Sequence, residues 1–170
     1  YPGHHVYNVL LERYLVRGKG WMEYCIYPLY SPQSLIAEGT ANYGIELSFT
    51  DAERLDFEQQ VLYPLAGLDP ALAPRYAQLN ALLAKLGYAD NDIARQYLEG
   101  SITREEALEW LVNVRLYPAE KSAQRLQFYD AMGAYVINYN LGQDMAKAYV
   151  ERQGGTRAEH WAAFRDLMSS

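Results

Sequence analysis

Residues 31–49, SPQSLIAEGTANYGIELSF, contain the pattern that decides the fold class. Ser31 followed by Pro32 is typical of a helix start, because serine is a common N-terminal cap and proline fits the first turn of a helix. The apolar residues that follow have a helical period. The pattern therefore predicts a helix from about residue 33 to residue 49.

Small residues occupy the middle of this predicted helix, at Gly39, Ala41 and Gly44. Glycine in a helix interior destabilises the helix by roughly 1 kcal/mol relative to alanine. We therefore expect another group to pack very close to this helix. That group is either a second helix or a metal site.

Helical signals continue through nearly the whole chain. The capping-box pattern, a threonine with a glutamate three residues later, predicts helix starts at Thr50, Thr103 and Thr156. Asp69-Pro70 predicts another start, and Leu86-Gly87 and Glu99-Gly100 predict helix ends.

A long helical segment is predicted from about residue 119 to residue 152, with a kink at Gly133 or Gly142. No alternating strand pattern and no repeat of fixed period is present. The sequence therefore predicts an all-α fold, a multi-helix bundle of seven to nine helices.

Composition excludes several classes of protein. The chain has 170 residues, of which 50% are hydrophobic, enough for a core and too many for a disordered chain. With 15 basic and 21 acidic residues its formal charge is −6, which argues against a nucleic-acid partner. The lone Cys25 excludes an internal disulfide framework, and we expect it to be a small buried residue. No window is long and apolar enough to predict a membrane span.

The chain begins with Tyr1-Pro2-Gly3-His4-His5 and passes directly into helical periodicity. It has no initiator methionine and no signal-peptide pattern. We therefore expect these 170 residues to be the C-terminal portion of a longer chain. The compartment, bacterial cytoplasm or periplasm, is not indicated.

His4 and His5 are the first candidate metal ligands. Neutral imidazole is a common zinc ligand, and a hydrolytic zinc site usually has three protein ligands and one water. Neighbouring helical residues point about 100° apart, so one histidine is expected to bind the ion and the other to contact substrate or support a ligand. The alternative is an exposed or capping histidine pair at a helix start.

Glu38 and Asn42 are the second candidate pair, one helical turn apart on one face. A glutamate on one helix and a histidine on another would form part of a His₂Glu zinc site. Asn42 would then hydrogen-bond a metal-ligating side chain and orient it. The alternative is that this segment serves close helix packing only.

Together, residues 1–5 (YPGHH) and 36–42 (IAEGTAN) resemble a bacterial domain-of-unknown-function family of gluzincin-like zinc peptidases. That family has the signature His-Glu-x-x-Pro-Gly-His-His, followed further along by Glu-Gly-x-Ala. Weaker similarity continues through residues 101–107, 139–142 and 160–167, so the resemblance runs from residue 1 to about residue 168. The His-Glu pair of the signature would precede Tyr1.

The resemblance implies a helical metallopeptidase in which Zn²⁺ and a glutamate activate water to hydrolyse peptides. It makes Glu38 a zinc ligand and either His4 or His5 the histidine ligand. The second histidine and the general base would come from the upstream segment of the same parent chain. The resemblance also implies one helical catalytic domain over residues 1–170, with the metal-site helices at about 3–49 and the cleft and scaffold helices at about 50–170.

An oxyanion formed during peptide hydrolysis needs a hydrogen-bond donor. Tyr129 and Tyr139 lie on segments to which the resemblance points, and Arg125 lies one turn before Tyr129. These three residues are the predicted catalytic donors. The alternative for each tyrosine is core packing.

A second hypothesis comes from another functional class. The chain would be a non-catalytic helical binding or scaffold protein with a degenerate metal site. The residues before Tyr1 separate the two hypotheses, because the peptidase needs a His-Glu pair there. For the 170 residues alone we expect no peptidase activity, since the general base is missing.

Overall fold

The computed structural model describes residues 2–169, and the side chains of residues 3–169. The described residues form helices and connecting turns without a strand, which confirms the all-α fold class. The chain divides into two compact units. Tyr1–Thr50 and Ile137–Ser170 form the first unit, and Asp51–Val136 form the second. The sequence did not predict this division.

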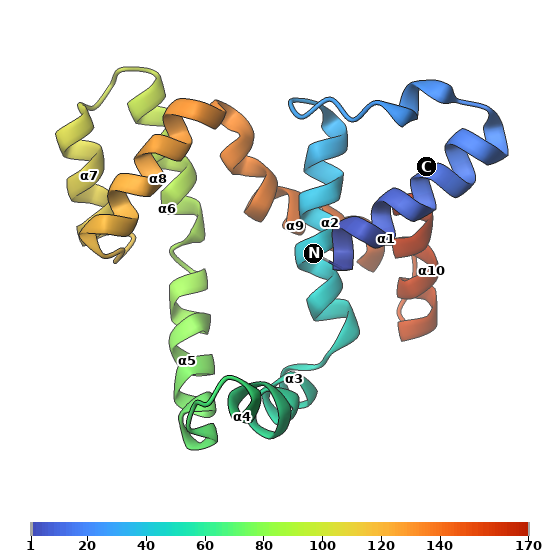
Figure 1. The fold of residues 1–170 in the computed structure, drawn as a ribbon, viewed down its shortest axis with the longest axis horizontal. Helices are drawn as coiled ribbons and strands as arrows, with labels where there is room; N and C mark the ends of the chain where they lie inside the picture. Colours follow the sequence, from blue (N-terminus) through green and yellow to red (C-terminus); the bar gives the residue numbers. More distant parts are fainter. Residues whose placement is uncertain (1, 170) are drawn as a thin grey trace. The chain divides into compact units, whose positions relative to one another are not determined.

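The first unit is built from two distant parts of the chain (Figure 1). Its helices are α1 (Pro2–Leu11), α2 (Pro32–Ser48), α9 (Ile137–Glu151) and α10 (Arg157–Met168). A π-helical turn, Glu12–Arg17, extends α1, and a short 3₁₀ helix, Met22–Cys25, lies in the connection to α2.

The second unit is continuous in sequence. Its helices are α3 (Asp51–Phe57), α4 (Tyr63–Leu65), α5 (Ala73–Ala84), α6 (Gly87–Leu98), α7 (Arg104–Asn113) and α8 (Ala119–Met132). A π-helical turn (Glu58–Leu62) and two 3₁₀ segments (Pro70–Leu72 and Gly133–Val136) connect them. Within residues 2–169, eight helices have ten residues or more, inside the predicted range.

Two predicted capping boxes are confirmed. Thr103 Oγ1 accepts from the Glu106 amide at 3.2 Å, and the Glu106 carboxylate accepts from the Thr103 amide at 2.7 Å. Thr156 and Glu159 form the same pair at the start of α10. The helix start at Pro32 is also confirmed, but not through a serine cap, because the hydroxyl of Ser31 donates to the carbonyl of Pro28.

Other boundary predictions have mixed outcomes. The long segment does break at Gly133, whose φ of +55° favours glycine, whereas Gly142 lies inside α9. The helix end predicted at Leu86-Gly87 is confirmed to within two residues, because α5 ends at Ala84, and the next helix, α6, begins at Gly87. Cys25 is exposed rather than buried, because it lies on the short 3₁₀ helix outside the packed faces.

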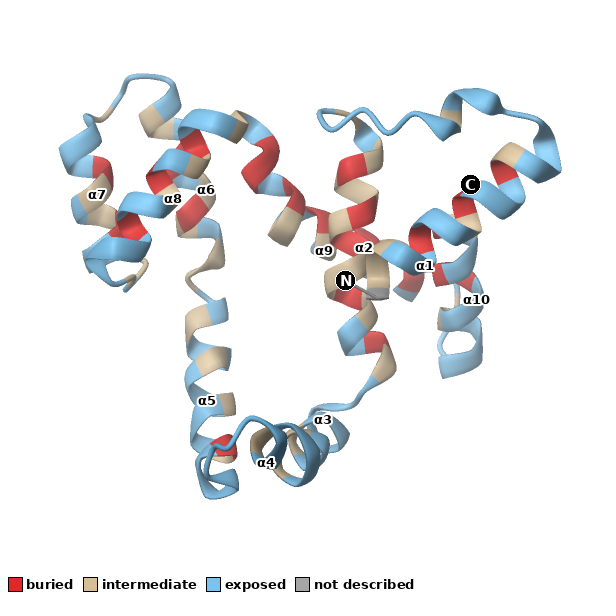
Figure 2. Cartoon of the chain, in the orientation of Figure 1, coloured by how far each residue is buried: buried red, intermediate tan, exposed pale blue. Residues whose placement is uncertain are grey.

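Each unit has its own apolar core (Figure 2). All four helices of the first unit contribute to its core, whose buried residues are Tyr7, Leu11, Leu15, Ala37, Tyr43, Leu47, Ala146, Val150, Ala163, Phe164 and Met168. The second core consists of Ile93, Ala94, Ala107, Leu111, Leu126, Tyr129 and Val136.

Helices α2 and α9 cross with their backbones in contact at two glycines. A Cβ atom added at Gly39 would lie 2.2 Å from the carbonyl oxygen of Gly142. A Cβ atom added at Gly142 would lie 2.7 Å from the carbonyl oxygen of Leu35. No side chain fits at this crossing, so both positions require glycine.

A second close crossing joins α1 to α2. A Cβ atom added at Gly3 would lie 2.7 Å from the Cα atom of Ala41. The expectation that another group packs very close to the helix at residues 39–44 is therefore confirmed. The close neighbours are helices, α9 at Gly39 and α1 at Ala41.

Gly39→Ala is expected to lower the free energy of unfolding by about 3 kcal/mol, because the new methyl group would force α2 and α9 apart. Gly44→Ala is the matched control on the same helix. Its added Cβ atom would lie 3.5 Å from Phe164, an ordinary contact, so we expect it to stabilise the protein by roughly 0.5–1 kcal/mol. Urea unfolding measures both, and equal effects would show that the crossing is not tight.

Ionisation of Tyr7 makes the free energy of unfolding depend on pH in the alkaline range. Burial, with the nearby hydroxyls of Tyr27 and Tyr24, raises the pKa of Tyr7 from 10.0 to about 12. The unfolded chain therefore loses this proton at lower pH than the folded chain. The contribution of Tyr7 to stability is fully present below pH 10 and is lost as the pH rises from 10 to about 12.

Tyr7→Phe is expected to reduce this alkaline fall in the free energy of unfolding. The measurement is urea unfolding at a series of pH values. Experiments near neutral pH, where neither state ionises, give the separate packing effect of the lost hydroxyl. An unchanged alkaline fall in the variant would contradict the role given to Tyr7.

Candidate metal centre

The crossing of α1 and α2 brings His4 next to Glu38. Gly3 lies against Ala41, so the start of α1 rests on the middle of α2. In this arrangement His4 Nε2 lies 3.3 Å from Glu38 Oε2. The side chains are 41% and 17% exposed, respectively, so the pair lies at the edge of the core and faces solvent on one side.

The structure separates the two histidines that the sequence left equivalent. His4 faces Glu38, whereas the next residue, His5, is exposed. This agrees with the expected divergence of neighbouring helical side chains. His4 is therefore the histidine that could share a metal ion with Glu38. Tyr1, the first residue of the quoted motif, lies outside the described residues.

The spacing of the pair fits one metal ion. Zinc bonds of about 2.0–2.1 Å to nitrogen and oxygen, at a tetrahedral angle, place the two donor atoms about 3.3 Å apart. The observed separation of His4 Nε2 and Glu38 Oε2 is 3.3 Å, which is also the distance of a direct ion pair between the two side chains. Among the described residues, no group of three or more histidine, cysteine, aspartate or glutamate side chains comes together. This pair would therefore supply two ligands of a site that needs a third.

The side chain of Asn42 on α2 forms a hydrogen bond with the backbone of Tyr139 on α9. The Asn42 side-chain amide donates to the carbonyl oxygen of Tyr139 at 3.0 Å and so joins α2 to α9. Asn42 was expected to orient a metal ligand, and Tyr139 to donate its hydroxyl to an oxyanion. The observed bond shows only their contribution to the helix crossing, and both functional roles stay predictions.

Sequence reasoning missed Tyr27, which lies in the connection before α2. Its hydroxyl donates to Ser34 Oγ at 2.9 Å, and Ser34 in turn donates to the carbonyl of Leu29. Ser34 precedes Glu38 by one helical turn on the same face. Partial burial raises the pKa of Tyr27, and the negative charge of Glu38 raises it further. The Tyr27 hydroxyl therefore stays protonated at neutral pH.

The sequence contains only part of the information that places Tyr27 near Ser34 and Glu38. The four-residue spacing of Ser34 and Glu38 placed two polar side chains on one helix face. The position of Tyr27 depends on an irregular connection, whose path hydrophobic periodicity does not determine. The serine hydroxyls hold that connection in place, since Ser31 donates to Pro28 and Ser34 to Leu29.

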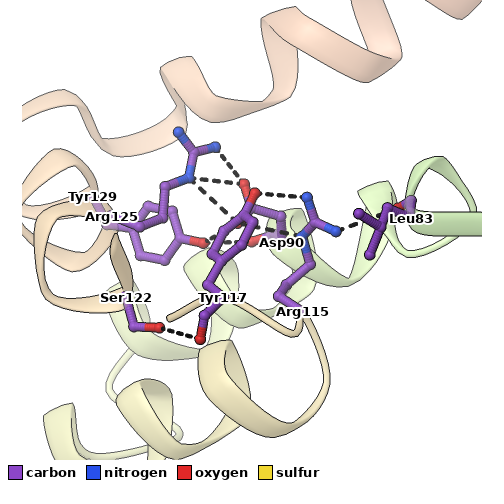
Figure 3. A network of polar contacts seen from close by, with 7 residues as sticks. All are labelled: Leu83, Asp90, Arg115, Tyr117, Ser122, Arg125 and Tyr129. Atoms are coloured by element: carbon purple, nitrogen blue, oxygen red, sulfur yellow. Dashed lines mark hydrogen bonds and ion pairs between the residues drawn. The ribbon is translucent and has the colours of Figure 1, made fainter. Parts of the chain in front are cut away.

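Arg125 and Tyr129 belong to a buried network in the second unit (Figure 3). The Tyr129 hydroxyl donates to Asp90 Oδ1 at 2.7 Å, and Arg125 Nε donates to Asp90 Oδ2 at 3.0 Å. A second contact joins Arg125 Nη2 to the same carboxylate, and Arg115 Nε lies 3.9 Å from it. These contacts connect α6 to α8 and to the turn after α7.

This network gives Arg125 and Tyr129 a structural role that requires no part in catalysis. Asp90 is 5% exposed and Tyr129 is fully buried. Burial and the negative charge of Asp90 raise the pKa of Tyr129 well above its usual value. As placed, the Tyr129 hydroxyl is engaged by Asp90 and does not reach solvent. The roles predicted for Tyr129 and Arg125 in oxyanion stabilisation stay untested.

Asp90→Asn is expected to lower the free energy of unfolding by about 3 kcal/mol, because it leaves two arginines beside a neutral group in a buried site. Asp92→Asn on the same helix is the control. Asp92 pairs with Arg95 on the exposed surface, where solvent screens the pair and its loss has little effect on stability. Urea unfolding of both variants is the measurement. Similar effects of the two substitutions would show that the buried network does not stabilise the second unit.

Two further findings bear on function. In the part of the chain that the structure describes, no helix is both long and apolar enough to cross a membrane. Comparison with protein-family models, with curated proteins and with solved structures finds no match for this chain.

Proposed function

We propose that this chain takes part in zinc-dependent hydrolysis of peptides and supplies part of the metal site and of the substrate cleft. One observation supports the proposal above others. His4 and Glu38, on different helices, present their donor atoms at the separation expected for two ligands of one tetrahedral ion. The proposal also rests on the resemblance of residues 1–5 and 36–42 to a family of zinc peptidases.

Each residue has a distinct role in this proposal. His4 Nε2 and Glu38 Oε2 would hold Zn²⁺, which supplies a Lewis acid that activates water and polarises a peptide carbonyl. Glu38 lies on α2, which close packing against α1 and α9 keeps in place. The Tyr27 hydroxyl is close to Glu38 and donates its proton to Ser34 Oγ. It would donate to a substrate carbonyl only in exchange for its bond to Ser34, so Tyr139 remains the candidate donor.

One observation favours the second function, that of a non-catalytic binding or scaffold protein. The described residues bring together two potential ligands and not three. A helical binding or scaffold protein with a degenerate site would also have this arrangement. The two functions differ in metal binding and in hydrolysis. A chain with a His-Glu pair ahead of Tyr1 is expected to hydrolyse peptides in a chelator-sensitive way if the proposal is right.

Metal binding by the 170-residue chain tests the proposal directly. Co²⁺, which replaces Zn²⁺ and gives a visible spectrum, is titrated into the protein. His4→Ala and Glu38→Gln are each expected to raise the dissociation constant at least about tenfold, because each removes one of two ligands. His5→Ala is the matched control and is expected to leave the affinity unchanged, because His5 is exposed.

Two results would count against the proposal. An effect of His5→Ala as large as that of His4→Ala would show that the wrong histidine is assigned. Binding that neither His4→Ala nor Glu38→Gln alters would show that the metal binds elsewhere, and the scaffold function would then be favoured.

A further inference from the structure

The second unit exposes an apolar surface along residues 61–82, from the π-helical turn before α4 to the middle of α5 (Figure 2). Its exposed large apolar residues are Val61, Leu62, Leu65, Leu68, Leu72, Tyr76, Leu79 and Leu82. Leu65, at 80% exposed, has the highest exposure of the large apolar residues in the described chain. Among residues 61–82 only Ala73 is buried. A large exposed apolar patch usually marks an interaction site.

The buried face of α5 is made of small residues, and most of its large residues lie outside that face. Ala73 is buried, and Ala77, one turn later, is half-buried. Tyr76, Leu79 and Leu82 recur every three residues along another face and are 48–60% exposed. A helix of 12 residues is marginal in water by itself and depends on packing of its large apolar side chains. The exposed face of α5 is therefore suited to a partner that covers it.

This surface is almost free of charge. Between positions 59 and 84 the charged residues are Asp69 and Arg75, one of each sign, so the stretch is neutral within a chain of formal charge −6. Two copies of a surface with a net charge would repel each other, whereas two neutral copies meet no such cost. A strongly acidic or basic partner would find no complementary charge here. Neutrality thus favours a second copy of the same surface as the partner.

Asp69 and Arg75 also make the surface complementary to itself. Arg75 is exposed, and its guanidinium forms no hydrogen bond or ion pair with any described residue. Asp69 accepts from the Ala71 amide through Oδ1 at 2.9 Å, which leaves Oδ2 for another donor. In a twofold dimer every contact occurs twice, with the roles of the two copies exchanged. Arg75 of each copy can therefore pair with Asp69 of the other within one interface.

The size and composition of the surface suit a dimer. A stable interface commonly takes about 20–30 residues from each partner, and residues 59–84 form a stretch of that length. Tyrosine and arginine are enriched in interfaces and often dominate their binding energy, whereas most other charged residues are depleted. Tyr76 and Arg75 are adjacent to each other here, among leucines.

We propose that the face of α5 formed by Tyr76, Leu79 and Leu82, with the turn before it, binds the same surface of a second copy of this chain. The leucine side chains pack across a twofold axis, and Arg75 of each copy pairs with Asp69 of the other. The surface belongs wholly to the second unit and includes none of the candidate metal ligands. Dimerisation is therefore independent of the proposed hydrolysis.

Sedimentation equilibrium of the 170-residue chain tests the proposal by measuring the dissociation constant of the dimer. Leu79→Glu places a charge on the paired face and is expected to raise this constant at least about tenfold. Leu79 is exposed, so the variant should fold, and circular dichroism verifies this. Met22→Glu is the matched control, because Met22 is also exposed but lies in the first unit. The control should dimerise as the parent chain does.

An exchange of charges tests the pairing of Arg75 with Asp69. Arg75→Glu and Asp69→Lys are each expected to weaken the dimer at least about tenfold, because each puts like charges together twice in every dimer. The double variant restores both pairs with their signs exchanged and is expected to dimerise within about threefold of the parent chain. A local loss of structure in either single variant would persist in the double variant, so recovery identifies the contact itself.

Three results would overturn the proposal. A monomer at every concentration up to about 100 μM would show that some other molecule covers this surface. A dimer that Met22→Glu dissociates and Leu79→Glu does not would place the contact in the first unit. A double variant that dimerises no better than the single variants would show that Arg75 and Asp69 do not meet across the twofold axis.

Discussion

The first unit depends on the contact between the backbones of α2 and α9 at Gly39 and Gly142. A single added methyl group would overlap the opposite carbonyl. Because the helices approach so closely, short side chains can bridge them: Asn42 reaches the carbonyl of Tyr139. The ion pair between Glu46 and Lys147 lies further along the same pair of helices. Two segments about a hundred residues apart in sequence are thereby held in one register.

A different part of α2 contacts a second helix, α1. Ala41 receives Gly3 of α1, and this contact places His4 beside Glu38. Helix α2 has glycine at positions 39 and 44 and is weakened by them, because glycine favours the unfolded chain. Tertiary packing offsets this weakness. Gly39, which weakens α2 locally, allows the close approach of α9, whereas Ala41 makes the contact with α1 beside Glu38.

The second unit relies on a different interaction, the buried carboxylate of Asp90 between arginines. Removing charges from water is expensive, so such a group is tolerated only when its partners are close and well oriented. Arg125 and the Tyr129 hydroxyl provide this for Asp90. The two residues that the resemblance suggested for catalysis thus contribute to the joint between α6 and α8.

Local sequence determined the all-α class, the helix starts at Thr103 and Thr156, and the break at Gly133, because these follow from hydrogen bonds and backbone angles within a few residues. It also identified Glu38 and a neighbouring histidine pair as candidates. Only the tertiary structure selected His4 over His5, exposed Cys25, and gave Asn42 and Tyr129 their partners. Those outcomes depend on how helices cross and how connections run, and contacts between residues far apart in sequence decide both.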